Sequence, residues 1–132
     1  STLSSSSAAS DVYKRQVSVP SHCELMRPAA ERFAESIAAI NWQAPQIPLV
    51  QNVSAAVAAD LDTLKRDLLE QLYKPVRWVE SVQTLAANGA TELVECGPGK
   101  VLAGLNKRCA EGVSTSNLNT PDAFAAARAA LA

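Results

Sequence analysis

The sequence has few of the residues that define several common classes of protein. Its 132 residues include three cysteines, Cys23, Cys96 and Cys109, and no two of them form a C-x-x-C pair. An odd number of cysteines without this spacing argues against a disulfide framework and against a structural zinc site. We therefore expect a protein of the reducing cytoplasm.

The sequence also has a small net charge and no long apolar run. The formal net charge is -1 at pH 7, and no run of Lys or Arg restores the basic surface of a nucleic-acid binder. No apolar stretch approaches the roughly 18 residues that span a bilayer, and the N-terminus lacks the layout of a signal peptide. The apolar fraction of 48% is sufficient for one domain of ordinary size, whose partners we expect to be small molecules or proteins.

The first 16 residues differ from the rest of the chain. They begin with a Ser-rich stretch that has neither helical nor strand periodicity, and the string from Ser6 to Gln16 resembles a translated sequencing adapter. We expect residues 1–16 to be a disordered, non-native tail. The natural sequence would then begin at Val17 within a longer gene, and residues 17–132 would be the C-terminal part of a domain.

From Val17 onward, apolar strands alternate with amphipathic helices, which predicts an α/β fold with parallel strands. Pro28 fixes the start of the first helix, since proline is tolerated only in the first turn. A capping box at Ser21 and Glu24 would bury Pro28 inside the helix and is rejected. The expected elements are an extended run at 17–20, helices at about 28–40, 61–73, 76–88, 101–110 and 121–131, and strands at 47–53, 92–96 and 113–118.

His22 is the only histidine, and the predicted start of the first helix places it in the preceding loop. An imidazole acts as a general base when an acceptor holds one ring nitrogen and leaves the other free. The carbonyl of Gln71 is a candidate acceptor, because its usual helical donor would be residue 75, a proline without an N–H. A lone histidine is more often a surface or satisfied core residue, and from the residues alone an ordinary helix end, with its carbonyl satisfied by water, is favoured for Gln71.

Two other places have a chemical and an ordinary interpretation. The turn Gly97–Lys100 follows a predicted strand, but it matches neither common phosphate-binding motif, so a plain strand-to-helix turn is favoured. Cys23 adjoins His22, yet neighbouring side chains rarely converge on one reacting atom. We therefore do not expect Cys23 to be a nucleophile.

Three strings carry a resemblance to a known family: VSVPSHCELMRPAA (17–30), QLYKPVRW (71–78) and ECGPGKVL (95–102). Together they resemble the bacterial malonyl-CoA:acyl carrier protein transacylases, in the right order and over essentially all of residues 17–132. The first string favours these enzymes over polyketide synthase acyltransferase domains, which remain an alternative. The resemblance implies the C-terminal part of a hydrolase-like acyltransferase core.

The resemblance also implies the roles of the candidate residues. His22 would be the general base and acid of a Ser–His pair, the main-chain carbonyl of Gln71 would orient it, and Asn52 would support substrate binding. Malonyl-CoA and acyl carrier protein would be the substrates of a ping-pong transfer in fatty acid biosynthesis, without a cofactor or metal. The whole enzyme would be a cytoplasmic monomer.

The chain departs from the family where the nucleophile is concerned. It contains no G-H-S-x-G motif, and the family's carboxylate-binding arginine and glutamine-bearing loop are likewise not found, so the chain by itself is expected to be inactive. The alternative is a non-catalytic module that binds acyl carrier protein or another acidic partner. Its basic residues would be Lys74, Arg77, Lys100, Lys107 and Arg108.

Overall fold

The computed structural model describes residues 20–130, so the predicted tail at 1–16 lies outside the described residues, as does most of the extended run at 17–20. From residue 78 onward, helices and parallel strands alternate as the sequence predicts, which confirms the α/β class. The elements are η1 (Glu24–Met26), α2 (Arg27–Ala38), α3 (Leu61–Glu70), α4 (Trp78–Ala87), β1 (Glu92–Glu95), α5 (Val101–Asn106), β2 (Ser114–Asn117) and α6 (Pro121–Ala130).

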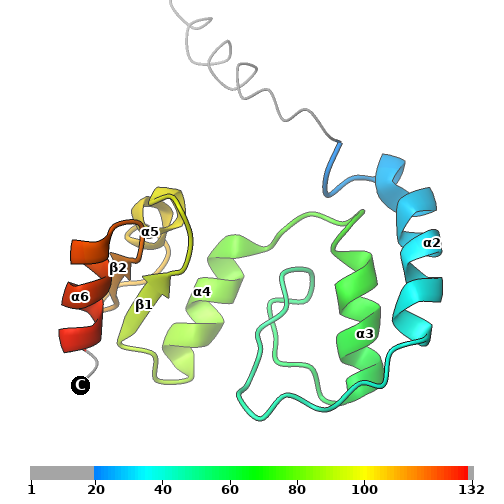
Figure 1. The fold of residues 1–132 in the computed structure, drawn as a ribbon, viewed down its shortest axis with the longest axis horizontal. Helices are drawn as coiled ribbons and strands as arrows, with labels where there is room; N and C mark the ends of the chain where they lie inside the picture. Colours follow the sequence, from blue (N-terminus) through cyan, green and yellow to red (C-terminus); the bar gives the residue numbers. More distant parts are fainter. Residues whose placement is uncertain (1–19, 131–132) are drawn as a thin grey trace, which may run out of the picture.

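The C-terminal half is a β1–α5–β2 unit followed by α6. The two strands are parallel, with Glu92 opposite Ser114 and Glu95 opposite Asn117, which confirms both predicted strands. Helix α5 packs against this pair and α6 against β2 (Figure 1). Before β1, Gly89 ends α4 with φ 92°, a left-handed conformation that glycine adopts without strain.

The N-terminal half is a pair of antiparallel helices, α2 and α3, which lie side by side in Figure 1. Pro28 lies in the first turn of α2, as predicted. At the start of α3 the carboxylate of Asp60 accepts a hydrogen bond from the Thr63 N–H at 2.7 Å. The buried faces carry Ala30 and Ile37 on α2 and Leu64 on α3.

The predicted strand at 47–53 is wrong. This segment is irregular, with one isolated bridge between Val50 and Val57, and Ile47 is 79% exposed. Pro48 has no N–H for a ladder, and the chain reverses directly after Val50 because the Gln51 N–H donates to the Ala56 carbonyl at 2.9 Å. In the described residues, no strand lies beside the segment to pair with it.

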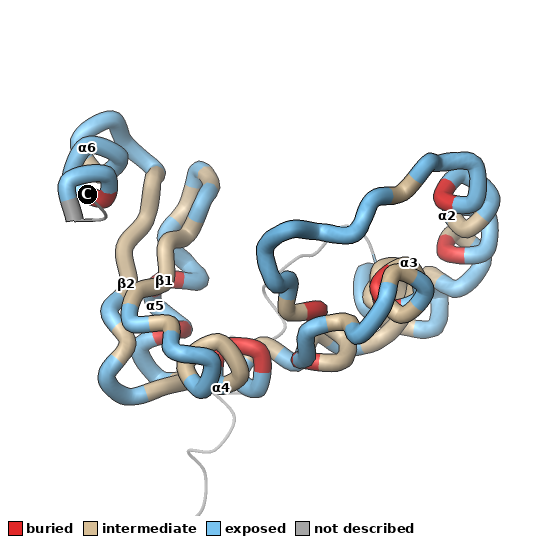
Figure 2. The backbone as a smooth tube through the Cα atoms, turned by 90° about the horizontal axis from the view of Figure 1, so that it is seen from below, coloured by how far each residue is buried: buried red, intermediate tan, exposed pale blue. Residues whose placement is uncertain are grey.

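The described residues bury few large side chains, and Val82 on α4 is the one with less than 2% exposure. Figure 2 shows buried positions scattered along α2, α3, α4 and α5 rather than gathered in one centre. Large apolar side chains remain exposed in both halves: Leu25, Phe33, Ile40, Ile47, Leu49, Val57, Val79, Val101, Leu102, Leu105 and Phe124. Such a surface is typical of one that packs against further polypeptide.

Val82 and Val79 on α4 provide a matched test of where the core lies, since they are 1% and 50% exposed. We expect Val82→Ala to lower the free energy of unfolding by about 2 kcal/mol, because it removes buried methyl groups and leaves a cavity. Val79→Ala should change it by less than about 0.5 kcal/mol. Urea unfolding measures both, and equal losses would contradict this placement of the core.

The Asp60 cap of α3 should make the stability of the fold depend on pH. The hydrogen bond from the Thr63 N–H lowers the pKa of Asp60 below its usual value. The ionised cap therefore stabilises the fold above the unfolded-state pKa of about 3.9, and this contribution is lost as the pH falls through the lower folded-state pKa. We expect Asp60→Ala to lower the midpoint of thermal unfolding at neutral pH. The difference in midpoint between this variant and the wild type should shrink in acid. A difference in midpoint that does not change with pH would contradict the role of the Asp60 carboxylate as an ionised cap.

Candidate active site

His22 lies in the loop before η1 in a left-handed backbone conformation, with φ 59°. This region is uncommon for residues other than glycine, although histidine enters it more often than most. The conformation is held from outside the loop, because the His22 N–H donates to the Leu72 carbonyl at 2.9 Å. His22 is thus attached to the end of α3 through its backbone, while its side chain is exposed.

The ring of His22 reaches the acceptor that the sequence suggested. Its Nδ1 lies 2.6 Å from the Gln71 carbonyl oxygen. Lys74 donates its N–H to Glu70 at 2.8 Å, and the next donor would be Pro75, which has none, so the Gln71 carbonyl is open to the ring. Because a carbonyl can only accept, Nδ1 carries the proton in this contact. The neutral ring then has its lone pair on Nε2.

Asn52 joins the same group through the side chain of Gln71. Its Nδ2 donates to Gln71 Oε1 at 3.1 Å, and both residues are partly buried. Gln71 therefore contacts His22 through its main chain and Asn52 through its side chain. The structure brings together all three residues singled out from the sequence, with Asn52 one step removed from the imidazole.

The turn at 51–56 that carries Asn52 is fixed to α4 and the residue before it by three hydrogen bonds. The Arg77 N–H donates to the Asn52 carbonyl at 2.9 Å, and Arg77 Nη1 to the Ser54 carbonyl at 3.0 Å. Thr84 Oγ1 donates to the carbonyl of Ala55 at 2.7 Å. Asn52 is consequently placed by helix α4, although it belongs to an irregular segment.

A cavity of ≈ 440 Å³ opens beside Asn52, between α4 and the end of β1. It is mainly apolar, and its polar residues include Asn52, Ser81, Glu95 and Asn106. Trp78 Nε1 donates to Asn106 Oδ1 at 3.0 Å across its wall. His22 does not line the cavity, so the site has two neighbouring parts: the exposed imidazole and an apolar recess that Asn52 borders.

Glu95, which the sequence analysis missed, binds the backbone amides that follow the Gly97–Lys100 turn. Its carboxylate accepts the Leu102 N–H at 3.3 Å and the Ala103 N–H at 2.8 Å at the start of α5. A side-chain anion thus occupies the amides that a phosphate loop would offer, which supports the plain-turn interpretation. An acidic residue just before Gly-Pro-Gly was the only clue in the sequence.

Cys23 and two of the proposed basic residues make contacts with residues close to them in sequence. Cys23 Sγ donates to the Pro20 carbonyl at 3.2 Å, within its own loop. Two of the five basic residues proposed for an acidic partner form ion pairs, Lys74 with Glu70 at 2.7 Å and Arg77 with Glu80 at 3.3 Å. These contacts weaken both a catalytic Cys23 and a single basic docking surface.

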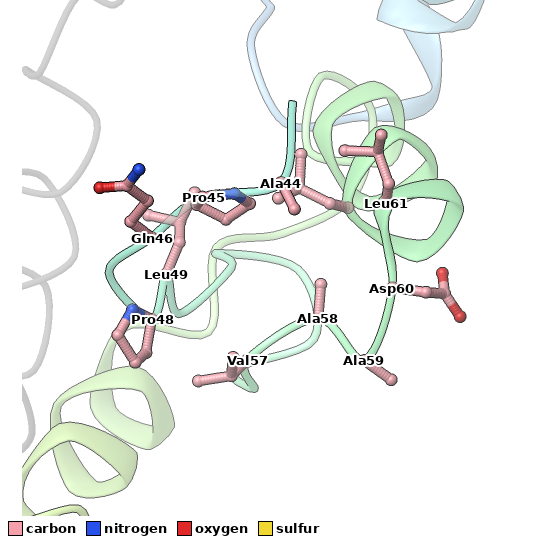
Figure 3. A pocket seen from close by; sticks show the side chains of 11 residues that line it. Ala44, Pro45, Gln46, Pro48, Leu49, Val57, Ala58, Ala59, Asp60 and Leu61 are labelled. Atoms are coloured by element: carbon pink, nitrogen blue, oxygen red, sulfur yellow. The ribbon is translucent and has the colours of Figure 1, made fainter. Parts of the chain in front are cut away.

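A second cavity, of ≈ 290 Å³, lies between the segments 44–49 and 57–61 (Figure 3). Its lining is mostly alanine, proline, leucine and valine. Asp60 is the charged residue among those that line it, and its carboxylate caps α3. This cavity contains none of the candidate site residues and offers no reactive group.

Across residues 20–130, no group of three or more His, Cys, Asp and Glu side chains is placed to hold a metal ion. Within the same range, no helix has the length and apolar character needed to cross a membrane.

Comparison with known proteins supplies the context of this site. The chain matches no protein-family model. It is 49% identical over 111 residues to the malonyl CoA-acyl carrier protein transacylase of Escherichia coli K12, which covers 84% of this chain and 36% of that protein. It is 40% identical over 122 residues to the Bacillus subtilis transacylase, covering 92% of this chain and 38% of that protein.

Solved structures agree with the sequence matches. The malonyl-CoA:acyl carrier protein transacylase of Xanthomonas oryzae superimposes with a TM-score of 0.83 at 46% identity, covering 93% of this chain and 40% of that one. A malonyl-transacylase in complex with a type II polyketide acyl-carrier protein gives a TM-score of 0.79 at 40% identity, covering 85% of this chain and 36% of that one.

The fold and the matches together show an α/β architecture shared with the malonyl-CoA:acyl carrier protein transacylases. The chain is similar to these enzymes over most of its own length, and it spans about 36% of the length of the curated relatives it matches.

Glu95 gives a direct test of the loop beside the apolar cavity. We expect Glu95→Ala to destabilise the chain by about 1 kcal/mol, as loss of a helix cap does, and to speed amide exchange at Leu102 and Ala103. Glu111→Ala, an exposed residue beyond α5, is the matched control and should leave those amides unchanged. Unaltered exchange in Glu95→Ala would show that the carboxylate does not hold the loop.

Proposed function

We propose that this chain supplies the general base and acid, His22, for transfer of a malonyl group from CoA to acyl carrier protein. The observation that supports the proposal most strongly is the 2.6 Å contact between His22 Nδ1 and the Gln71 carbonyl. It directs the free lone pair of the neutral ring to Nε2, the arrangement a base needs to activate a hydroxyl nucleophile. Homology to named transacylases supplies the reaction.

In the first half-reaction, Nε2 takes the proton of a serine hydroxyl as the serine oxygen attacks the malonyl thioester. The tetrahedral intermediate collapses, the C–S bond breaks, and the imidazolium returns its proton to the departing CoA sulfur. In the second half, Nε2 takes the proton of the phosphopantetheine thiol of acyl carrier protein as its sulfur attacks the malonyl-serine ester. The C–O bond then breaks, and the imidazolium returns the proton to the serine oxygen. Protons balance on His22 in each half, and we propose that no cofactor or metal takes part.

The serine belongs, in this proposal, to polypeptide beyond these 132 residues, because the chain spans about 36% of its relatives and contains no G-H-S-x-G motif. Two features support a missing neighbour. The exposed apolar side chains need a cover, and a parallel sheet of two four-residue strands is far smaller than parallel sheets that stand alone. The whole enzyme is therefore the unit that would turn over.

Asn52 is proposed to act on substrate from the border of the apolar cavity, where its amide is oriented by Gln71 Oε1. Acyl carrier protein is the proposed second substrate, in keeping with the carrier complex of one relative. Location in the cytoplasm stays a prediction, supported by free Cys23, Cys96 and Cys109, which a reducing compartment preserves. A non-catalytic carrier-binding module is the alternative.

The experiment joins residues 17–132 to the remaining part of a homologous transacylase and follows acylation of its serine by malonyl-CoA. We expect His22→Ala to lower the acylation rate by about 10²–10⁴-fold, the usual contribution of a positioned base. The matched control is Gln71→Ala, which removes the contact to Asn52 but keeps the main-chain carbonyl. It should cost less than about tenfold, since each step of 1.36 kcal/mol changes the rate tenfold.

Full activity in the His22→Ala hybrid would remove His22 from the mechanism. A loss in Gln71→Ala as large as that in His22→Ala would assign the role to the Gln71 side chain instead of its carbonyl. A hybrid that folds and binds acyl carrier protein but is never acylated would favour the non-catalytic module.

A further inference from the structure

The segment 22–27 contacts three consecutive residues in the turn that directly follows α3. The His22 ring contacts the Gln71 carbonyl, and the His22 N–H donates to the Leu72 carbonyl. The third contact is made five residues later, where the Arg27 guanidinium carbon lies 4.2 Å from the centre of the Tyr73 ring. A guanidinium over an aromatic face at this distance is attracted by the ring.

Arg27 is itself oriented by Glu24, in the same segment. Its Nε and Nη2 donate to the two carboxylate oxygens of Glu24 at 2.7 Å and 2.9 Å, a two-point pairing that fixes the plane of the guanidinium. The hydrogen bond from Arg27 lowers the pKa of Glu24, and the same bond raises the pKa of Arg27, so both groups are charged at neutral pH. The stack on Tyr73 is therefore made by an oriented cation.

We propose that Arg27 is a positioning residue for His22: its stack on Tyr73 closes the segment 22–27 onto the end of α3 and keeps the imidazole on the Gln71 carbonyl. The left-handed backbone of His22, with φ 59°, needs such support, because residues in this region persist when their surroundings hold them there. The proposal rests on the proposed function only in giving His22 a catalytic purpose.

The stack is separate from the contacts that hold the helices together. The Arg27 side chain is 48% exposed. The buried apolar side chains of α2 and α3 are instead those of Ala30, Ile37 and Leu64. Loss of the stack should consequently loosen the His22 loop and leave helix α3 intact. This difference between a local and a global effect makes the proposal testable.

The test measures amide and imidazole proton exchange by NMR in the ¹⁵N-labelled chain, where the single histidine gives one imidazole. In Arg27→Met and in Tyr73→Leu, we expect the His22 N–H and Nδ1–H to exchange about two- to fivefold faster, the ratio that a cation–π contact at an exposed site provides. The Leu64 N–H, bonded to the Asp60 carbonyl at 3.1 Å inside α3, should not change.

Two further variants separate positioning from general damage. Tyr73→Phe keeps the aromatic face and should exchange like wild type, and Arg32→Met makes the same chemical change at an exposed position on the same helix. Unchanged His22 exchange in Arg27→Met, or equal acceleration at Leu64, would overturn the proposal. Proton exchange is measured without malonyl transfer, so the two proposals are tested separately. If exchange at His22 is unchanged while His22→Ala still abolishes acylation, only the positioning role of Arg27 is overturned. If exchange is faster as expected but His22→Ala keeps full activity, only the catalytic role of His22 is overturned.

Discussion

The hydrogen bond from the His22 ring to the Gln71 carbonyl is the contact on which the site depends, and it exists because α3 cannot continue past Lys74. Pro75 offers no N–H, so the Gln71 carbonyl has no helical donor. Gln71 is partly buried, and the imidazole supplies the donor that its carbonyl lacks. One bond therefore serves both the helix end and the orientation of the proposed base.

From this bond the arrangement extends through Gln71 to the rest of the site. Residues 49 positions apart in sequence meet at the carbonyl, and the amide of the same residue holds Asn52. Asn52 is in turn bound through its carbonyl to the Arg77 N–H, which precedes α4 and the apolar cavity. The imidazole and the cavity are thereby linked through two main-chain carbonyls, those of Gln71 and Asn52, and through the side-chain hydrogen bond between these two residues.

The sequence predicted those features whose cause is local. Pro28 fixed the start of α2, and Pro75 identified the open carbonyl of Gln71 before any contact was known. Apart from the contact between His22 and Gln71, tertiary contacts were not predicted. The strand at 47–53 was wrong because a strand exists only where another strand pairs with it. Glu95 and the stack of Arg27 on Tyr73 were likewise missed, since each depends on segments that meet only after folding.

The measurement that tests the central claim most directly is the protonation of the single imidazole in the chain with the ring neutral. Long-range ¹H–¹⁵N correlation spectra distinguish a protonated Nδ1 from a protonated Nε2. The account predicts that Nδ1 carries the proton, because it donates to the Gln71 carbonyl 2.6 Å away, and that Nε2 has the free lone pair. A neutral ring with its proton on Nε2 would contradict the account, because Nδ1 could not then donate to that carbonyl.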